Sequence, residues 1–233
     1  MRPAVATAVL GLAVAVASPT AWVLTRPAAM AGAPVEQALG TPPASSPVAV
    51  PAVPGVLPPA TARPAAPAAR TQPPVPVRLT APGLGVDAAV DAVGVQPDGQ
   101  MLLPDDVDRV GWYRFGPAPG AGGSAVIAGH VDDREQGLGA MAAFREAEVG
   151  QEVQVTDGAG TTTRWRVVSR ELIEKQVLPL DRLFARDGPA RLTLITCGGP
   201  FDRKTRHYEL NVLVYAQLTG QRPRQDSNLR PTA

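Results

Sequence analysis

Apolar and polar residues alternate over short segments of the chain from about residue 77 onward. Such alternation is typical of strands, and Gly, Asp and Pro separate the segments as turns. The expected strands are Ala88–Val95, Ser124–Ala128, Glu152–Thr156, Thr162–Glu171, Arg191–Thr196 and Tyr208–Gln217. Helical pattern is confined to short pieces near Leu138–Phe144 and Pro179–Phe184. Many short strands with regular turn signals predict a mainly β protein, folded as a closed or nearly closed β-barrel.

A longer, uncharged and mostly apolar stretch runs from Ala4 to Leu24, with an arginine on either side. As a helix it would span about 30 Å, the hydrocarbon thickness of a bilayer. Trp22 stands near its end, where an interfacial aromatic residue is expected. We therefore predict a membrane anchor within residues 1–26, with the amino terminus inside. A cleaved signal peptide remains the alternative, with residues 28–33 as the cleavage region.

The remaining segments differ sharply in composition. Residues 27–76 are rich in proline and alanine, which offer too little apolar area to offset the entropy of ordering. We predict an extended, partly polyproline-like linker over this range. The folded domain is expected at residues 77–218, and about 140 residues can bury a core of useful size. Residues 219–233 show no periodicity and are predicted to be a disordered tail.

Composition excludes several classes of function. The formal net charge is +1, so a surface for nucleic acid is not expected. One cysteine and two histidines give no recognisable zinc ligand set, and no metal or cofactor is predicted. The run Asp132–Glu135 is more typical of a solvated turn than of a calcium site.

Two residues stand at the ends of apolar strands. Cys197, the only cysteine, follows the expected strand Arg191–Thr196, and an unpaired thiol in an exported chain needs an explanation. His130 follows Gly129 at the end of the expected strand Ser124–Ala128. Two strand ends of one barrel can converge on one mouth, so we expect the pair to meet. A buried, inert cysteine and a hydrogen-bonded core histidine remain the alternatives.

A thiol beside an imidazole suits acyl transfer. The imidazole can stabilise the thiolate or protonate a leaving amine. Negative charge also develops on the carbonyl oxygen, and a guanidinium suits that charge. Arg203 and Arg206, in the loop before the last strand, are the candidates. Thr196 is expected to point away from Cys197 and to support the core, because side chains alternate along a strand.

These residues resemble a known family. Thr193–Cys197 (TLITC) matches the TLxTC signature of sortases, the cysteine transpeptidases of Gram-positive surfaces. Gly129–His130, Gly198–Asp202 and Val110–Tyr113 resemble the actinobacterial class F branch. The resemblance covers roughly residues 77–217 and extends to the anchor and linker. It implies an eight-stranded barrel that carries a Cys–His–Arg site.

The family resemblance also implies a reaction. The thiolate attacks the Thr–Gly carbonyl of an LPxTG-like sorting signal, and an amine of a cell-wall precursor or a protein resolves the thioacyl enzyme. Carried over, Cys197 is the nucleophile and His130 the acid/base. The arginine carries over less directly, because Glu209 stands where class F members often have arginine. We predict Arg206, nine residues after the cysteine, with Arg203 second.

The sequence thus predicts a class F sortase-like transpeptidase, anchored in the cell membrane with its catalytic domain outside. Its expected partners are LPxTG-like surface proteins, an amine acceptor and the membrane, without nucleic acid. One alternative is a catalytically impaired module that binds sorting signals or wall peptides. Another is a cysteine peptidase that hydrolyses without transfer.

Overall fold

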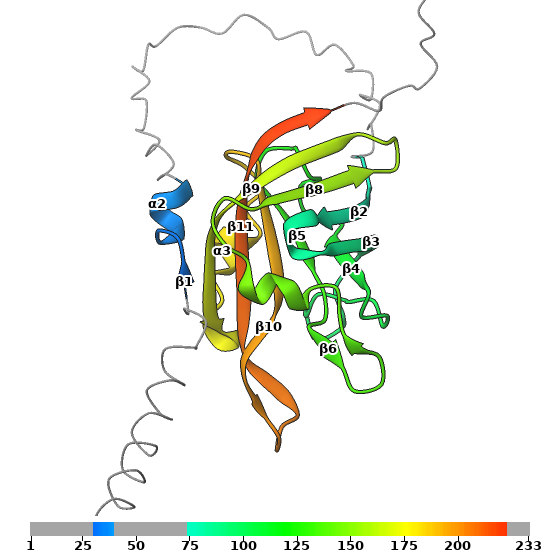
Figure 1. Cartoon of the computed structure of the whole chain (residues 1–233), viewed down its shortest axis with the longest axis vertical. Helices are drawn as coiled ribbons and strands as arrows, with labels where there is room; N and C mark the ends of the chain where they lie inside the picture. The colour runs from blue at the N-terminus through cyan, green and yellow to red at the C-terminus, as the bar shows by residue number, and fades with distance from the viewer. Residues whose placement is uncertain (1–29, 40–73, 223–233) are drawn as a thin grey trace, which may run out of the picture.

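The computed structural model describes residues 30–39 and 74–222 (Figure 1). Within them, nine strands form one sheet and two form a small separate hairpin. The strands are β1 (Met30–Ala31), β2 (Pro76–Ala81), β3 (Val86–Val93), β4 (Arg109–Tyr113), β5 (Ser124–Ala128), β6 (Asp132–Asp133), β7 (Gly137–Leu138), β8 (Glu152–Asp157), β9 (Thr162–Glu174), β10 (Arg191–Asp202) and β11 (His207–Arg222). The helices are α2 (Val35–Leu39) and α3 (Leu180–Leu183), with 3-10 helices η1 (Pro82–Leu84), η2 (Ala142–Glu146) and η3 (Lys175–Val177).

The large sheet closes into a barrel. Its order is β9-β11-β10-β5-β4-β3-β2-β8, and β8 pairs again with β9, which gives the eight strands that the family resemblance implied. Two pairings are parallel, β3 with β4 and β5 with β10, and the others are antiparallel. Closure removes open strand edges, which would otherwise attract other strands. The hairpin between β8 and β9 is also as predicted.

Side-chain alternation fills the barrel. The inward residues of each strand form one apolar cluster, in which Trp112, Phe144 and Trp165 are fully or almost fully buried. Trp165 donates its indole N–H to the hydroxyl of Thr163, so its polar atom is satisfied inside the barrel. Leu192 and Leu194 of β10 belong to this inner cluster, whereas Ile195 packs on the outer face. The site strand β10 is therefore buried on both of its faces.

A second, smaller cluster covers the outside of β9 and β11. The strand β1 pairs with β9 at Glu171 and Arg170, beyond the point where β8 stops, and α2 follows it beside the barrel (Figure 1). Val35 is completely buried against Leu183, Leu213 and Tyr215. This short amino-terminal segment therefore covers a strand edge and an apolar face that the barrel itself leaves open.

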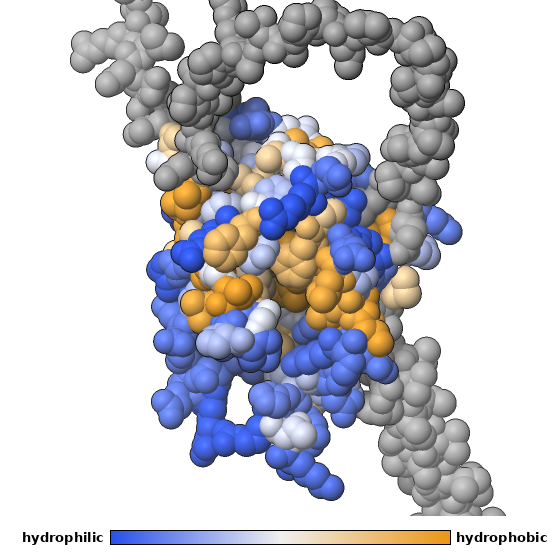
Figure 2. Space-filling model, turned by 180° about the vertical axis from the view of Figure 1, so that it is seen from behind, coloured by the Kyte–Doolittle hydropathy of each residue, from blue (hydrophilic) through white to orange (hydrophobic). Residues whose placement is uncertain are grey.

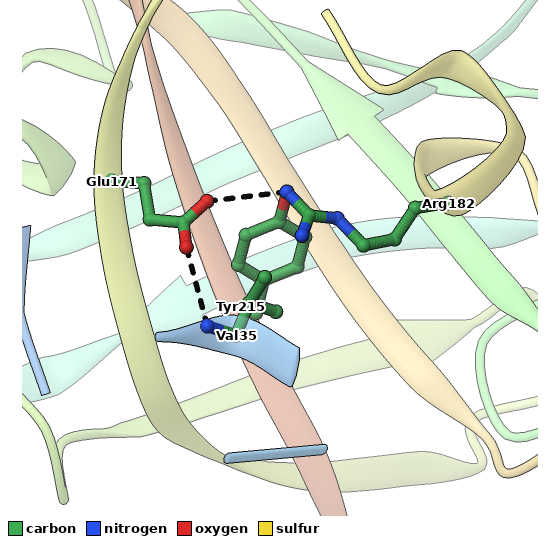
Figure 3. A network of polar contacts seen from close by, with 4 residues as sticks. All are labelled: Val35, Glu171, Arg182 and Tyr215. Atoms are coloured by element: carbon green, nitrogen blue, oxygen red, sulfur yellow. Dashed lines mark hydrogen bonds and ion pairs between the residues drawn. The ribbon is translucent and has the colours of Figure 1, made fainter. Parts of the chain in front are cut away.

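Polar contacts hold the segment in place (Figure 3). The backbone N–H of Val35 donates to Glu171 at 3.2 Å, and the other carboxylate oxygen of Glu171 pairs with Arg182 at 3.3 Å. Arg182 also donates to the hydroxyl of Tyr215 at 3.2 Å. Burial raises the pKa of Tyr215 to about 12, so its phenol stays protonated and neutral. The network joins α2, β9, β11 and α3.

The structure differs from the expected domain bounds at two places. Residues 30–39 fall in the expected linker, yet they form β1 and α2 on the barrel. Proline and alanine content hid this segment, because two strand residues and one buried valine give no periodic pattern. At the other end, β11 continues to Arg222, beyond the expected limit of 218, because its final residues pair with the start of β9. The expected anchor lies outside the described residues.

Docking of the amino-terminal segment predicts a stability effect. Val35→Ala should lower the free energy of unfolding by about 1–3 kcal/mol, because two buried methyl groups are lost from the outer cluster. Denaturant unfolding of both proteins measures this difference. Val177→Ala is the matched control, since Val177 is 64% exposed and should change stability little. Equal stabilities of the two variants would contradict docking of the segment in solution.

Candidate active site

Cys197 lies on the outer face of β10, close to the end of the barrel. Its antiparallel partner in β11 is Asn211. The thiol is partly exposed, whereas Thr196 is 3% exposed and points into the barrel, as alternation predicted. Immediately after the cysteine, the register slips between Gly198 and Phe201. Cys197 therefore stands one residue before the end of the regular pairing, in a strand whose preceding residues are fixed by packing on both faces.

The parallel pairing of β5 with β10 brings the histidine to the cysteine. Ala128 lies opposite Ile195, and the N–H of Gly129 donates to the carbonyl of Ile195 at 3.2 Å. Continuing this register by two residues places His130 beside Cys197. His130 is partly exposed, so its imidazole is accessible from solvent.

Two features hold the histidine segment against β10. The hydroxyl of Thr196 donates to the carbonyl of Gly129 at 3.0 Å in a buried position. A side chain at Gly129 would not fit, because its Cβ would lie 2.8 Å from Met141 and 3.1 Å from Val110. The Gly–His pair and the threonine of the TLITC run thus have a packing role beside any chemical one. Nearer the start of the same two strands, the hydroxyl groups of Ser124 and Thr193 form a buried hydrogen bond of 2.9 Å. This bond joins β5 to β10 and is structural.

A lysine that the sequence did not single out reaches the thiol. The ammonium nitrogen of Lys175 lies 3.7 Å from the sulfur of Cys197. Lys175 is the first residue of η3, directly after β9, and is partly buried. No motif marked it, because it lies just beyond the end of β9, 22 residues before the cysteine, and comes close only through the pairing of β9 with β11.

The two predicted arginines lie at the tip of the β10–β11 hairpin. Asp202 and His207 are the last paired residues, and Arg203 and Arg206 lie in the exposed turn between them. Arg206 has a φ of 57°, the left-handed conformation of a tight turn. At about 3.3 Å per residue, the pair at the base of this turn is about 13 Å along the strands from Cys197. Figure 1 shows the hairpin projecting below the barrel.

A second hairpin, β6–β7, stands next to the histidine. The hydroxyl of Tyr208 donates to the carboxylate of Asp132 and links this hairpin to β11, and the same bond raises the pKa of Tyr208. Asp133 accepts the N–H groups of Glu135 and Gln136, which lower its pKa, and nearby His130 contributes in smaller part. The predicted acidic turn is thus a hydrogen-bonded loop whose carboxylates lie near the imidazole.

A large cavity of about 1410 Å³ lies close by, on the other face of the strands. Leu172, Leu210 and Val212 line it from the inward face of β9 and β11, and Leu138 and Pro200 from the two hairpins. Cys197 does not line it, so the reactive face is elsewhere. The view from behind in Figure 2 shows apolar side chains across the middle of the molecule and hydrophilic ones over the hairpins at its lower end.

The chain belongs to the sortase family. The family model for the sortase domain matches residues 79–219, which is more than half of the chain and nearly the whole described barrel. No curated protein matches the chain significantly. The family is one of cysteine transpeptidases that sort proteins to the cell wall.

A solved sortase shares the fold, and others are similar in sequence. Sortase A of Listeria monocytogenes is 18% identical, with a TM-score of 0.50, and the match covers 66% of this chain and 92% of that one. A sortase of Actinomyces oris is 19% identical over 69% of this chain and 96% of that one, with a TM-score of 0.49. Sortase A of Corynebacterium diphtheriae is 20% identical over 68% and 65%, with a TM-score of 0.47. At these identities the likeness concerns the barrel alone.

Sortases typically act at the cell surface in association with the membrane. Among residues 30–39 and 74–222, no helix has the length and apolar character needed to cross a bilayer. The predicted anchor at residues 4–24 lies outside these ranges and stays a prediction.

The buried bond of Thr196 yields a prediction. Thr196→Val should lower the free energy of unfolding by about 1–3 kcal/mol, because the carbonyl of Gly129 loses its buried donor. Chemical denaturation measures the change. Thr219→Val is the matched control: its hydroxyl donates to the carbonyl of Arg164 at an exposed position, where water replaces it. A loss no larger than that of the control would show that Thr196 does not hold the two strands together.

Proposed function

We propose that this chain is a class F sortase-type transpeptidase in which Cys197 is the nucleophile and His130 the general acid/base. The observation that carries the proposal is the parallel pairing of β5 and β10 within a sortase domain, which supports a thiol and an imidazole at adjacent strand ends. Class F membership rests on the sequence motifs around these residues.

The proposed reaction has two acyl transfers. The sulfur of Cys197 bonds to the carbonyl carbon of the Thr–Gly bond in an LPxTG-like signal, and the π electrons move to the oxygen. The C–N bond then breaks, and His130 gives a proton to the leaving amine. An acceptor amine attacks the thioester, loses a proton to His130 and displaces the thiolate. Electrons and protons balance without a cofactor.

Exposed apolar residues that follow Lys175 in sequence support a peptide substrate. Val177 and Leu180, on this connection, are 64% and 58% exposed although they are apolar. Exposed apolar residues are typical of a binding surface. They suit the leucine and proline of the sorting signal. We further propose that residues 4–24 anchor the enzyme in the membrane and that the barrel acts outside the cell on surface proteins.

One observation favours a second candidate, a binding module with impaired turnover. Glu209 stands where class F members often have arginine, on the same β11 face as Asn211, and the two candidate arginines lie in the exposed turn. A carboxylate there would oppose an oxyanion. In this case the barrel would hold sorting or wall peptides without cleaving them.

An acyl adduct tests the transpeptidase. The full chain, mixed with a panel of fluorogenic LPxTG-type peptides, should give a thioester adduct on Cys197 that mass spectrometry detects. Cys197→Ala should give none, because the bond-forming sulfur is gone. Folded wild-type protein that forms no adduct with any peptide would rule out the proposal. Peptide binding that persists in Cys197→Ala, without wild-type cleavage, would select the binding module. Added amine should convert hydrolysed product into transferred product, which a simple peptidase would not do.

The histidine has an internal control. His130→Ala should slow adduct formation by about 10²–10⁴-fold, because proton transfer to the leaving amine is lost. His207→Ala, at the exposed base of the hairpin turn, should leave the rate unchanged. Stopped-flow release of the fluorogenic amine measures both rates. Equal rates for the two variants would remove His130 from the mechanism.

A further inference from the structure

Three neighbouring strands bring a positive charge to the thiol. Cys197 of β10 lies opposite Asn211 of β11, and Asn211 lies opposite Ile173 of β9. The chain continues from Ile173 for two residues to Lys175, whose side chain reaches back across β11 to the sulfur, at 3.7 Å. β5, which leads to His130, pairs with β10 on the side opposite β11. The ammonium group of Lys175 therefore reaches the thiol from the β11 side of β10.

We propose that Lys175 is the cationic catalytic residue of this site and takes the part that the sequence assigned to Arg206. This inference rests on the proposed function. It also differs from the family pattern, because the charge comes from the start of the β9–β10 connection instead of from the strand after the cysteine.

The geometry suits both negative species of the reaction. The thiolate carries its charge on the sulfur itself. In each tetrahedral intermediate, the oxyanion is attached to the carbon that bonds the sulfur, so it lies within about one hydrogen-bond length of the sulfur. An ammonium 3.7 Å from the sulfur can donate to that oxygen with a small change of side-chain torsion. Lysine is a flexible point charge with three donors, and it suits a position that must serve two intermediates in turn.

The surrounding charges agree with this role. Glu209 lies two residues before Asn211 on β11, so alternation puts its side chain on the outer face of the sheet, the face that also carries Cys197. Extending the β9–β11 pairing by one residue beyond Glu174 and Leu210 sets Lys175 opposite Glu209. Glu209 is compatible with a site that uses Lys175, because an arginine in its place would repel the ammonium group. Glu174 is exposed, and its alternation places it on the other face.

Paired substitutions test the assignment. The full chain is compared with Lys175→Met, Lys175→Arg, Lys204→Met and Arg206→Met, with denaturant unfolding to verify that each variant is folded. Lys204 is an exposed lysine of the hairpin turn and serves as the matched control.

Lys175→Met should lower kcat for the fluorogenic peptide by about 10²–10³-fold with little change in KM, because the lost interaction forms with the oxyanion. Lys175→Arg should recover part of kcat, while the two hairpin variants stay near wild type. A large loss in Arg206→Met with none in Lys175→Met would overturn the proposal.

A second measurement needs no peptide. Iodoacetamide alkylates the thiolate of Cys197, and Lys175→Met should slow this reaction at neutral pH by at least about threefold, because the stabilising ammonium is removed. Lys204→Met should not slow it. If wild-type protein forms no acyl adduct, the proposed function fails. The alkylation rates still test the lysine in that case, and equal rates for wild type and Lys175→Met would overturn its contact with the thiol.

Discussion

The parallel pairing of β5 with β10 is the constraint on which the site depends. Extended beyond Ala128 and Ile195, this register sets His130 level with Cys197. The buried hydrogen bond from the hydroxyl of Thr196 to the carbonyl of Gly129 fixes the register. Parallel neighbours cannot be joined by a tight turn, and the chain between these two forms the hairpin β8–β9, which closes the barrel. The two strand ends can meet only when that barrel closes, and the chemistry is therefore a property of the complete domain.

The long strand β9 both closes the barrel and positions residues on its outer surface. Its first half pairs with β8 and closes the barrel, and its second half leaves an edge that β1 covers. Its last residues carry Lys175 to the thiol. The ion pair of Glu171 with Arg182 ties the same strand to α3, within the connection that follows the lysine. The packing of the outer apolar cluster and the position of the Lys175 ammonium beside Cys197 thus both depend on β9.

The sequence predicted the barrel well. Strand Ser124–Ala128 and the β8–β9 hairpin appear as expected, because alternation and turn residues act locally. The sortase motifs predicted the family that the domain match shows. Local patterns missed the docked residues 30–39, whose order comes from long-range contacts of Val35 with β11 and α3. They also offered Arg206 as the cation, because spacing from the cysteine was the only available guide.

The amino-acid sequence by itself determined the kinds of residue: one thiol, a histidine after a glycine, and strands whose alternation decides which side chains enter the core. These follow from local sterics and from burial of apolar side chains, which act over a few residues. Only the tertiary structure decided which charge stands beside the thiol. That choice depends on which strands pair and in which register, and the register comes from closing the whole barrel around its core. Lys175 and Cys197 are neighbours in space because β11 lies between their strands, which no pattern along the chain reveals.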